Sequence, residues 1–295
     1  MTIVWAFVTC GWMDQSMNTF SRCNWRSAFA VATLSLASFA PIQQAQAAGD
    51  LLVAPTRVVL DGRRGTEVIL NNIGVEEATY RISLELRRMN DIGKLDDVAP
   101  EAANDKEKAV LEIIRFAPRR VTLPPNQPQS IRIGLQGTET LPDGEYRAHM
   151  LFRAIPKAAE ATAEEGPANG LKINLIPVYG VTIPVIIRKG ELKATAAIAN
   201  ATLVRDAEGA ALRFDIARKG DRSVFGEVHI TKPGVAEPLL VVKGIAVYPE
   251  LDARSVTLPL DAEAAAKMQG EVVISYYEAP EAGGGLITQL RTVLR

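Results

Sequence analysis

The sequence predicts an all-β protein made of two β-sandwich domains. Apolar and polar residues alternate with the two-residue period of strands in many short segments, as in Tyr80, Ile82, Leu84 and Leu86. Turns rich in glycine, aspartate and proline recur about every 8–12 residues, which is the spacing found in β-sandwiches. A length of 295 residues fits two domains of about 100–150 residues each.

The N-terminal segment has the pattern of an export signal. Arg22 and Arg26 precede an apolar stretch at 27–40, and a small-x-small triplet ends at Ala47. We expect a signal peptide over 1–47 that is cleaved near Ala47. A membrane-spanning interpretation is weaker, because the apolar run falls short of the roughly 20 residues that a bilayer requires.

Removal of this segment changes the chemistry of the chain. Met17 is the expected natural first residue, and the only two cysteines, Cys10 and Cys23, lie before the cleavage site. Two arginines and one aspartate are also removed, so the formal charge of −1 becomes −2. We therefore expect an exported protein with no disulfide, which is not embedded in a membrane and does not bind nucleic acid.

The first expected domain covers residues 48–190. A polar stretch at 90–108 is expected to be a solvated loop with at most a short helical turn, and an Ala/Glu-rich stretch at 157–170 is expected to be mobile. Asp61 and Gly65 provide hairpin chemistry between the first two strands. The expected strands are 51–60, 66–72, 78–89, 111–125, 129–136, 144–156 and 172–190.

The second expected domain covers residues 191–295 and begins near a junction at 188–191. It contains one short helical segment at 261–270 between strands. The expected strands are 193–206, 211–218, 223–231, 239–248, 254–260, 271–279 and 286–295.

The strand at 172–190 is unusually long. Ordinary strands have about 3–10 residues, and an exposed apolar strand of this length tends to aggregate unless something pairs with it. Pro177 and Pro184 favour an edge position, because proline cannot donate to a central ladder. The apolar row either binds a partner or fills the core of its own domain, and apolar residues on the opposite face support the second interpretation. The row consists of Ile173, Leu175, Pro177, Tyr179 and Val181.

Residues for catalysis are scarce. The two histidines, His149 and His229, lie on polar faces of their strands, and we expect both to be solvated surface residues. No pair of carboxylates can be placed face to face, and no cluster has the spacing of a metal site. The sequence therefore predicts no catalytic residue, no metal site, no cofactor and no enzymatic activity.

Four segments in order resemble a known family. They are TRVVLDG at 56–62, FAPRRVTLPPNQPQSIRI at 116–133, LPDGEYRAHMLFRAIP at 141–156, and the alternating strand that ends at Arg188. Together they resemble the N-terminal domain of the PapD-like periplasmic pilus-assembly chaperones. The resemblance implies two immunoglobulin-like sandwiches in a boomerang arrangement. It also implies that the last strand of the first domain is lent to an immature pilus or fimbrial subunit, which is delivered to an outer-membrane usher.

The resemblance also assigns roles to single residues. It implies that Arg57 binds the C-terminal carboxylate of the subunit, although Arg57 could also be an ordinary surface residue beside Asp61. Family members place a lysine on the lending strand where this chain has Pro184. Either Arg57 acts alone, or subunits are positioned differently, or a nearby cation substitutes. The cations considered are Arg119, Arg120 and Lys189.

The resemblance further implies an ion pair between Glu145 and Arg188 that helps to set the angle between the domains. Ordinary surface charge is the competing interpretation of these two residues. Two other functions stay open at this point. One is a two-domain adhesin or periplasmic scaffold that uses the same strand for a permanent partner, and the other is a secreted β-sandwich hydrolase that uses the two histidines.

Overall fold

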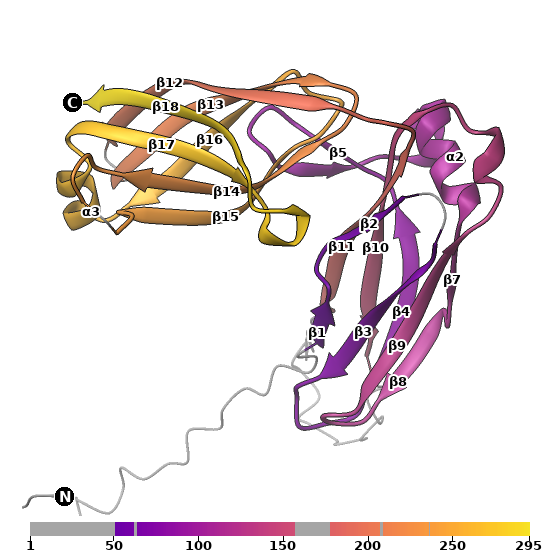
Figure 1. The fold of residues 1–295 in the computed structure, drawn as a ribbon. Helices are drawn as coiled ribbons and strands as arrows, with labels where there is room; N and C mark the ends of the chain where they lie inside the picture. Colours follow the sequence, from indigo (N-terminus) through magenta and orange to yellow (C-terminus); the bar gives the residue numbers. More distant parts are fainter. Residues whose placement is uncertain (1–50, 62–63, 157–177, 207–208, 236) are drawn as a thin grey trace, which may run out of the picture. The chain divides into compact units, whose positions relative to one another are not determined.

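The computed structural model describes part of the chain, and all the described residues belong to one compact unit, Ala47–Arg295 (Figure 1). The expected signal peptide, its cleavage near Ala47, the start at Met17 and the Ala/Glu-rich stretch lie outside the described residues. The same holds for Ile173, Leu175 and Pro177. The described ranges are 51–61, 64–156, 178–206, 209–235 and 237–295.

The first sandwich has two sheets, with strand orders β1-β3-β9-β7 and β2-β11-β10-β4-β8. In chain order these strands follow the immunoglobulin arrangement, in which the first, second, fifth and fourth strands form one sheet and the third, sixth and seventh the other. A separate ribbon pairs β5 with β6. The strands are β1 (Leu51–Ala54), β2 (Val58–Leu60), β3 (Thr66–Asn72), β4 (Ala78–Glu85), β5 (Arg87–Met89), β6 (Leu95–Asp97), β7 (Ile114–Ala117), β8 (Arg120–Leu123), β9 (Pro128–Leu135), β10 (Gly144–Ile155) and β11 (Gly180–Lys189).

The second sandwich also has two sheets, with orders β12-β13-β16 and β15-β14-β17-β18. The strands are β12 (Ala194–Asp206), β13 (Gly209–Gly220), β14 (Val224–Thr231), β15 (Leu240–Val247), β16 (Ala253–Leu260), β17 (Gly270–Glu278) and β18 (Leu286–Leu294).

Each sandwich has its own hydrophobic core. Tyr80 and Phe152 are buried in the first core, and Phe214 and Tyr276 are buried in the second. Alternate residues of each strand supply these side chains, as the two-residue period predicts. The prediction of an all-β chain with two sandwiches is confirmed. Within the described ranges, no helix combines the length and apolar character that crossing a membrane requires.

A nine-residue helix, α2 (Asp105–Ile113), corrects the expected loop and the expected strand start near residue 111. Asn104 caps the helix by accepting from the Glu107 amide at 2.9 Å, and Glu107 accepts from the Asn104 amide at 2.8 Å. This reciprocal capping box lets a polar sequence begin a helix. The second helix, α3 (Ala262–Lys267), lies within the expected segment. The short 3-10 turns are η1 (Pro100–Ala102), η2 (Thr138–Thr140) and η3 (Pro280–Ala282).

The first strand of the chain is split between the two sheets of the first sandwich. β1 pairs antiparallel with β3, and β2 pairs parallel with β11. The link between them crosses from one sheet to the other and places Arg57 immediately before β2. This crossing positions the candidate site.

Candidate binding site

The edge of β11 is only partly covered. β10 pairs with β11 along its whole length, but β2 faces only Val185–Ile187. Among the described strands, none pairs with the other edge of β11 from Gly180 to Pro184. Just before this segment, Val178 is 44% exposed and Tyr179 is 50% exposed. An open edge of this kind presents backbone groups that can pair with another strand.

The apolar row changes its surroundings along β11. Tyr179 is half exposed, Val181 is partly buried against the first core, and Ile183 is fully buried. The row therefore leaves the core of its own sandwich between Val181 and Tyr179. The core-filling interpretation describes the C-terminal part of the row, and the exposed Tyr179 suits the partner-binding interpretation.

Arg57 has polar and aromatic partners from the second sandwich. Its guanidinium donates to the Tyr248 hydroxyl at 3.2 Å and to Ser223 Oγ at 3.4 Å. It also lies 4.1 Å from the centre of the Phe225 ring, a cation–π distance. Among the described residues, no carboxylate lies within ion-pair distance of Arg57. Within the described ranges, the Arg57 guanidinium is therefore held in place by neutral partners.

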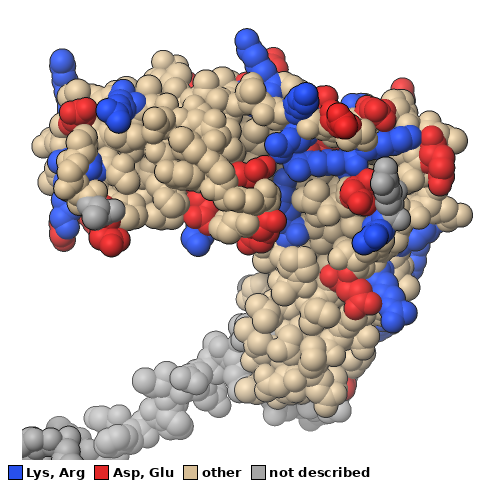
Figure 2. All heavy atoms as spheres, in the orientation of Figure 1, with Lys and Arg blue, Asp and Glu red and all other residues tan. Residues whose placement is uncertain are grey.

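Arg57 lines a pocket of about 850 Å³. Two of the other cations in its lining are paired, Arg222 with Glu278 at 3.4 Å and Lys243 with Glu227 at 3.3 Å. The lining also includes Arg188, the exposed Glu281 and the apolar residues Pro55, Val59, Phe225 and Pro280. Acidic and basic side chains lie intermixed on the surface, while wide areas carry neither (Figure 2).

Glu145 and Arg188 come together in the structure. Arg188 Nε donates to Glu145 Oε2 at 3.0 Å, and the Glu145 side chain is only 1% exposed. The same oxygen accepts from the Ser223 amide at 3.0 Å and from its hydroxyl at 2.9 Å. Arg188 also donates to Ser223 Oγ at 3.3 Å. Ser223 of the second sandwich therefore contacts both members of the ion pair, Glu145 and Arg188.

The three cations considered as substitutes for the family's lysine do not line this pocket. Lys189 Nζ donates to the carbonyls of Thr138 and Glu139 at 2.9 and 3.0 Å. Arg119 lies 5.0 Å from the centre of the Phe116 ring. Arg120 is exposed on β8, which lies at the edge of its sheet opposite to β2. Pro184 is also absent from the lining.

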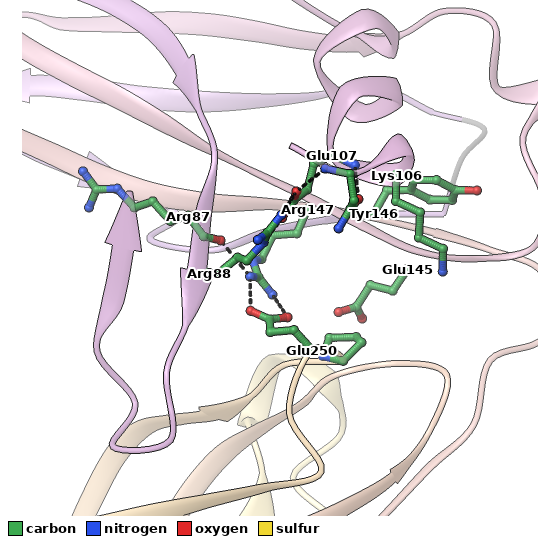
Figure 3. Close-up of a pocket in the computed structure, with 10 residues that line it drawn as sticks. Arg87, Arg88, Lys106, Glu107, Glu145, Tyr146, Arg147 and Glu250 are labelled. Atoms are coloured by element: carbon green, nitrogen blue, oxygen red, sulfur yellow. Dashed lines mark hydrogen bonds and ion pairs between the residues drawn. The ribbon is translucent and has the colours of Figure 1, made fainter. Parts of the chain in front are cut away.

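A second charged pocket, of about 230 Å³, contains two internal ion pairs in its lining (Figure 3). Arg147 donates to both oxygens of Glu250, at 2.5 and 3.2 Å, and lies 3.6 Å from the centre of the Tyr248 ring. Arg88 donates to both oxygens of Glu107 at 2.7 and 2.6 Å. The hydrogen bond from Arg88 lowers the pKa of Glu107.

His149 corrects the expectation of a solvated surface histidine, because it is 1% exposed. It lies on β10 between Glu85 of β4 and Pro184 of β11. Burial lowers its pKa to about 3, and the positive charges of Arg147, Arg87 and Arg57 act in the same direction.

His229 is closer to the expectation, with a side chain that is 32% exposed and 3.2 Å from Glu227. Among the described residues, no group of three or more His, Cys, Asp and Glu side chains could hold a metal ion.

Sequence reasoning missed several residues of the site. Ser223, Phe225 and Tyr248 contact Arg57 across 166 or more positions of the chain. No local pattern marks them, because their roles depend on how the two sandwiches meet. Arg222 and Glu250 were missed for the same reason.

Comparison with family models and with curated proteins finds no match. Among solved structures, the chain is similar to the E. coli chaperone DraB at 16% identity and a TM-score of 0.43, over 84% of this chain and 97% of that one. It is similar to the Pseudomonas aeruginosa CupB2 chaperone at 16% identity and a TM-score of 0.42, over 83% of this chain and 100% of that one. It is also similar to a chain of the Salmonella enterica SafA pilin in complex with the SafB chaperone, at 15% identity and a TM-score of 0.42, over 85% of this chain and 99% of that one.

Proposed function

We propose that the protein is a periplasmic chaperone that binds pilus or fimbrial subunits by lending them the edge of β11. The subunit pairs its own unfinished sheet with this edge and receives apolar side chains from the row that includes Leu175 and Tyr179. The chaperone then delivers the subunit to an outer-membrane usher. No cofactor and no catalytic step takes part.

The observation that carries this proposal is where the open edge of β11 ends. The uncovered segment stops at Pro184, because β2 begins opposite Val185. Arg57 directly precedes β2 and carries an unneutralised charge beside the 850 Å³ pocket. A guest strand that ends with its carboxylate at Arg57 would run parallel to β11, as β2 does. Arg57 would then set the depth of docking through charge-assisted hydrogen bonds.

The energetics of strand lending agree with this arrangement. Each apolar side chain that becomes fully buried contributes about 1.5–3 kcal/mol, and each ladder hydrogen bond contributes about 0.5–1.5 kcal/mol net. A guest can slide only in steps of two residues, because a one-residue shift would turn the apolar row to the other face. A few residues on each side of the new pairing are therefore enough for tight and specific binding.

The buried pair of Glu145 and Arg188 has a separate role in this proposal. Replacing a buried ion pair with apolar residues is often neutral for stability, so orientation is the better explanation of its presence. Ser223 of the second sandwich donates two hydrogen bonds to Glu145. The pair would thereby hold the second sandwich, and with it the pocket, in a fixed relation to β11.

The experiment that tests the proposal is co-purification of subunits from the periplasm. Leu175→Asp combined with Tyr179→Asp should leave the protein folded and abolish co-purification, because charges cannot enter the apolar groove of a subunit. The matched control is Leu286→Asp with Val293→Asp. These two residues are exposed apolar positions of β18, 50% and 61% exposed, at the edge of a sheet in the second sandwich.

Arg57→Ala tests the carboxylate anchor separately. Loss of a charged hydrogen bond worth about 1.5–3 kcal/mol should weaken subunit capture by roughly tenfold or more. Co-purification that persists in the double aspartate variant would disprove strand lending. Unchanged capture by Arg57→Ala would place the anchor elsewhere.

A further inference from the structure

We infer that Arg222 of the second sandwich is the second cation that binds the ligand carboxylate, and that Glu278 occupies Arg222 until the ligand displaces it. This inference rests on the proposed function. The family's second cation, a lysine, is replaced by Pro184 in this chain, and Arg222 would supply the second positive charge from another position. The ligand class is a polypeptide with a free C-terminal carboxylate. The inference is based on the arrangement of charged side chains in the pocket that Arg57 and Arg222 line.

Arg222 lies on a loop that is fixed at several points. The Asp221 carboxylate accepts from the Lys193 amide at 2.6 Å, and Arg218 donates to the Arg222 carbonyl at 3.1 Å. Ser223, the next residue, is held by Glu145. The backbone of Arg222 is thus anchored on both sides, and its side chain lines the same pocket as Arg57.

Two guanidinium groups contact Ser223, and a third, that of Arg222, belongs to the lining of the same pocket. Arg57 and Arg188 each contact the Ser223 hydroxyl, at 3.4 and 3.3 Å, and Arg222 is its chain neighbour. Glu145 neutralises Arg188 and Glu278 neutralises Arg222, which leaves one positive charge. A single carboxylate can pair with Arg57, whereas a dianion would add a second negative charge beside the exposed Glu281 of the same lining.

The two internal carboxylates differ in how firmly they are held. Glu145 has a side chain that is 1% exposed, and one of its oxygens accepts three hydrogen bonds. Glu278 makes one contact with Arg222 at 3.4 Å, and the side chains are 27% and 25% exposed. A long, partly solvated contact is weak, so an incoming carboxylate can replace Glu278. Glu278 then turns to water.

Lys243 is another paired cation of the pocket and suits the role less well. Its side chain is 73% exposed, so holding it in one position costs side-chain entropy. A guanidinium can donate to both oxygens of a carboxylate, which an ammonium does only as a point charge. Phe225 and Pro280 in the same lining provide apolar surface for the last side chain of the ligand.

The test uses the full-length mature protein and a synthetic probe. The probe is a fluorescein-labelled peptide of eight alternating apolar and polar residues with a free C-terminal carboxylate, compared with the same peptide as its C-terminal amide. Fluorescence anisotropy gives both dissociation constants, and their ratio measures the contribution of the carboxylate alone. The native protein should bind the acid at least tenfold more tightly than the amide.

Arg222→Gln should reduce this preference by about tenfold, and Arg222→Lys should restore part of it. Glu278→Gln should bind the acid severalfold more tightly, because the competing carboxylate is gone. Arg291→Gln is the matched control, since Arg291 is an exposed arginine of β18 outside the pocket. It should leave the ratio unchanged. Thermal melts of all variants check that they are folded.

The outcomes separate this inference from the proposed function. If Arg57→Gln removes the acid preference while Arg222→Gln and Glu278→Gln leave it unchanged, the inference is overturned and the anchor at Arg57 stands. If the native protein binds acid and amide equally, the anchor itself is wrong and the inference is wrong with it. If neither peptide binds, strand lending is contradicted.

Discussion

The two charged pockets contain similar residues but pair them differently. In the smaller one, Arg147 and Arg88 each donate two hydrogen bonds to a carboxylate (Figure 3). In the larger one, Arg57 contacts a phenol, a hydroxyl and an aromatic ring. Arg147 and Arg88 are each bound by both oxygens of a carboxylate, so they have little charge left to offer and serve the structure. Arg57 has no such partner among the described residues, and this difference is why we propose the larger pocket as the one that receives a ligand.

Tyr248 contributes to both arrangements. Its ring lies 3.6 Å from the Arg147 guanidinium, and its hydroxyl accepts from Arg57. The comparison therefore does not depend on two unrelated parts of the molecule. Tyr248 therefore contacts Arg147, which is paired with Glu250, and Arg57, which has no ion pair among the described residues. Substitutions near Tyr248 can separate the structural role of Arg147 from the proposed binding role of Arg57.

The largest expected effect comes from Glu250→Gln in the smaller pocket. The Arg147 side chain is 9% exposed, and removing its counter-ion leaves an uncompensated buried charge. The free energy of unfolding in urea should fall by about 3 kcal/mol. The exposed Glu271 provides the control as Glu271→Gln. If binding of the acid peptide falls as well while the protein stays folded, the two pockets do not have separate roles.

An intermediate effect is expected from His149, which is close to the arginines of both pockets. Its pKa of about 3 in the folded protein lies below the ordinary value of about 6.5, so the unfolded chain takes up a proton first as the pH falls. Stability should therefore decrease between about pH 6.5 and pH 3, by about 2 kcal/mol from pH 7.5 to pH 5.

The measurement is urea unfolding across this range for the native protein and for His149→Leu. The variant should lose the decrease between pH 7.5 and pH 5, where carboxylates remain ionised. A variant that keeps the full decrease would assign it to other groups. The buried His149 would then not be the source of the pH dependence of stability.

The smallest effect is expected from Arg88→Gln. The Arg88 side chain is 41% exposed, and exposed ion pairs contribute at most about 1 kcal/mol. The loss should shrink further at high salt, because solvated charges are screened. Thermal melts at low and high ionic strength measure both quantities. A loss as large as that of Glu250→Gln would mean that exposure does not separate the two pairs.

Much of the fold could be predicted because its signals are local. The alternation in β4 and β14 appears within a few residues and reports directly which side chains enter the core. The helix α2 was missed because its composition is polar, although Asn104 and Glu107 form a capping box that is visible in the sequence.

The candidate site was predictable only where a motif marks it. Arg57, Glu145 and Arg188 lie in segments that resemble a family, whereas Ser223 and Tyr248 lie in a domain without such a motif. His149 shows the physical limit most clearly. Alternation places it on the outer face of β10, but a small cluster that includes Ile186, Ala246 and Tyr248 packs on that face, and burial of this kind depends on contacts between the sandwiches.

The shortness of β2 has a consequence for what can bind. An added strand can lie beside β11 only until it meets Val58, so the described edge from Gly180 to Pro184 accommodates about five residues, or roughly 17 Å. β2 thus limits how far an added strand can extend along this edge. It would restrict guests by the length of their final extended segment, whatever the identity of its residues.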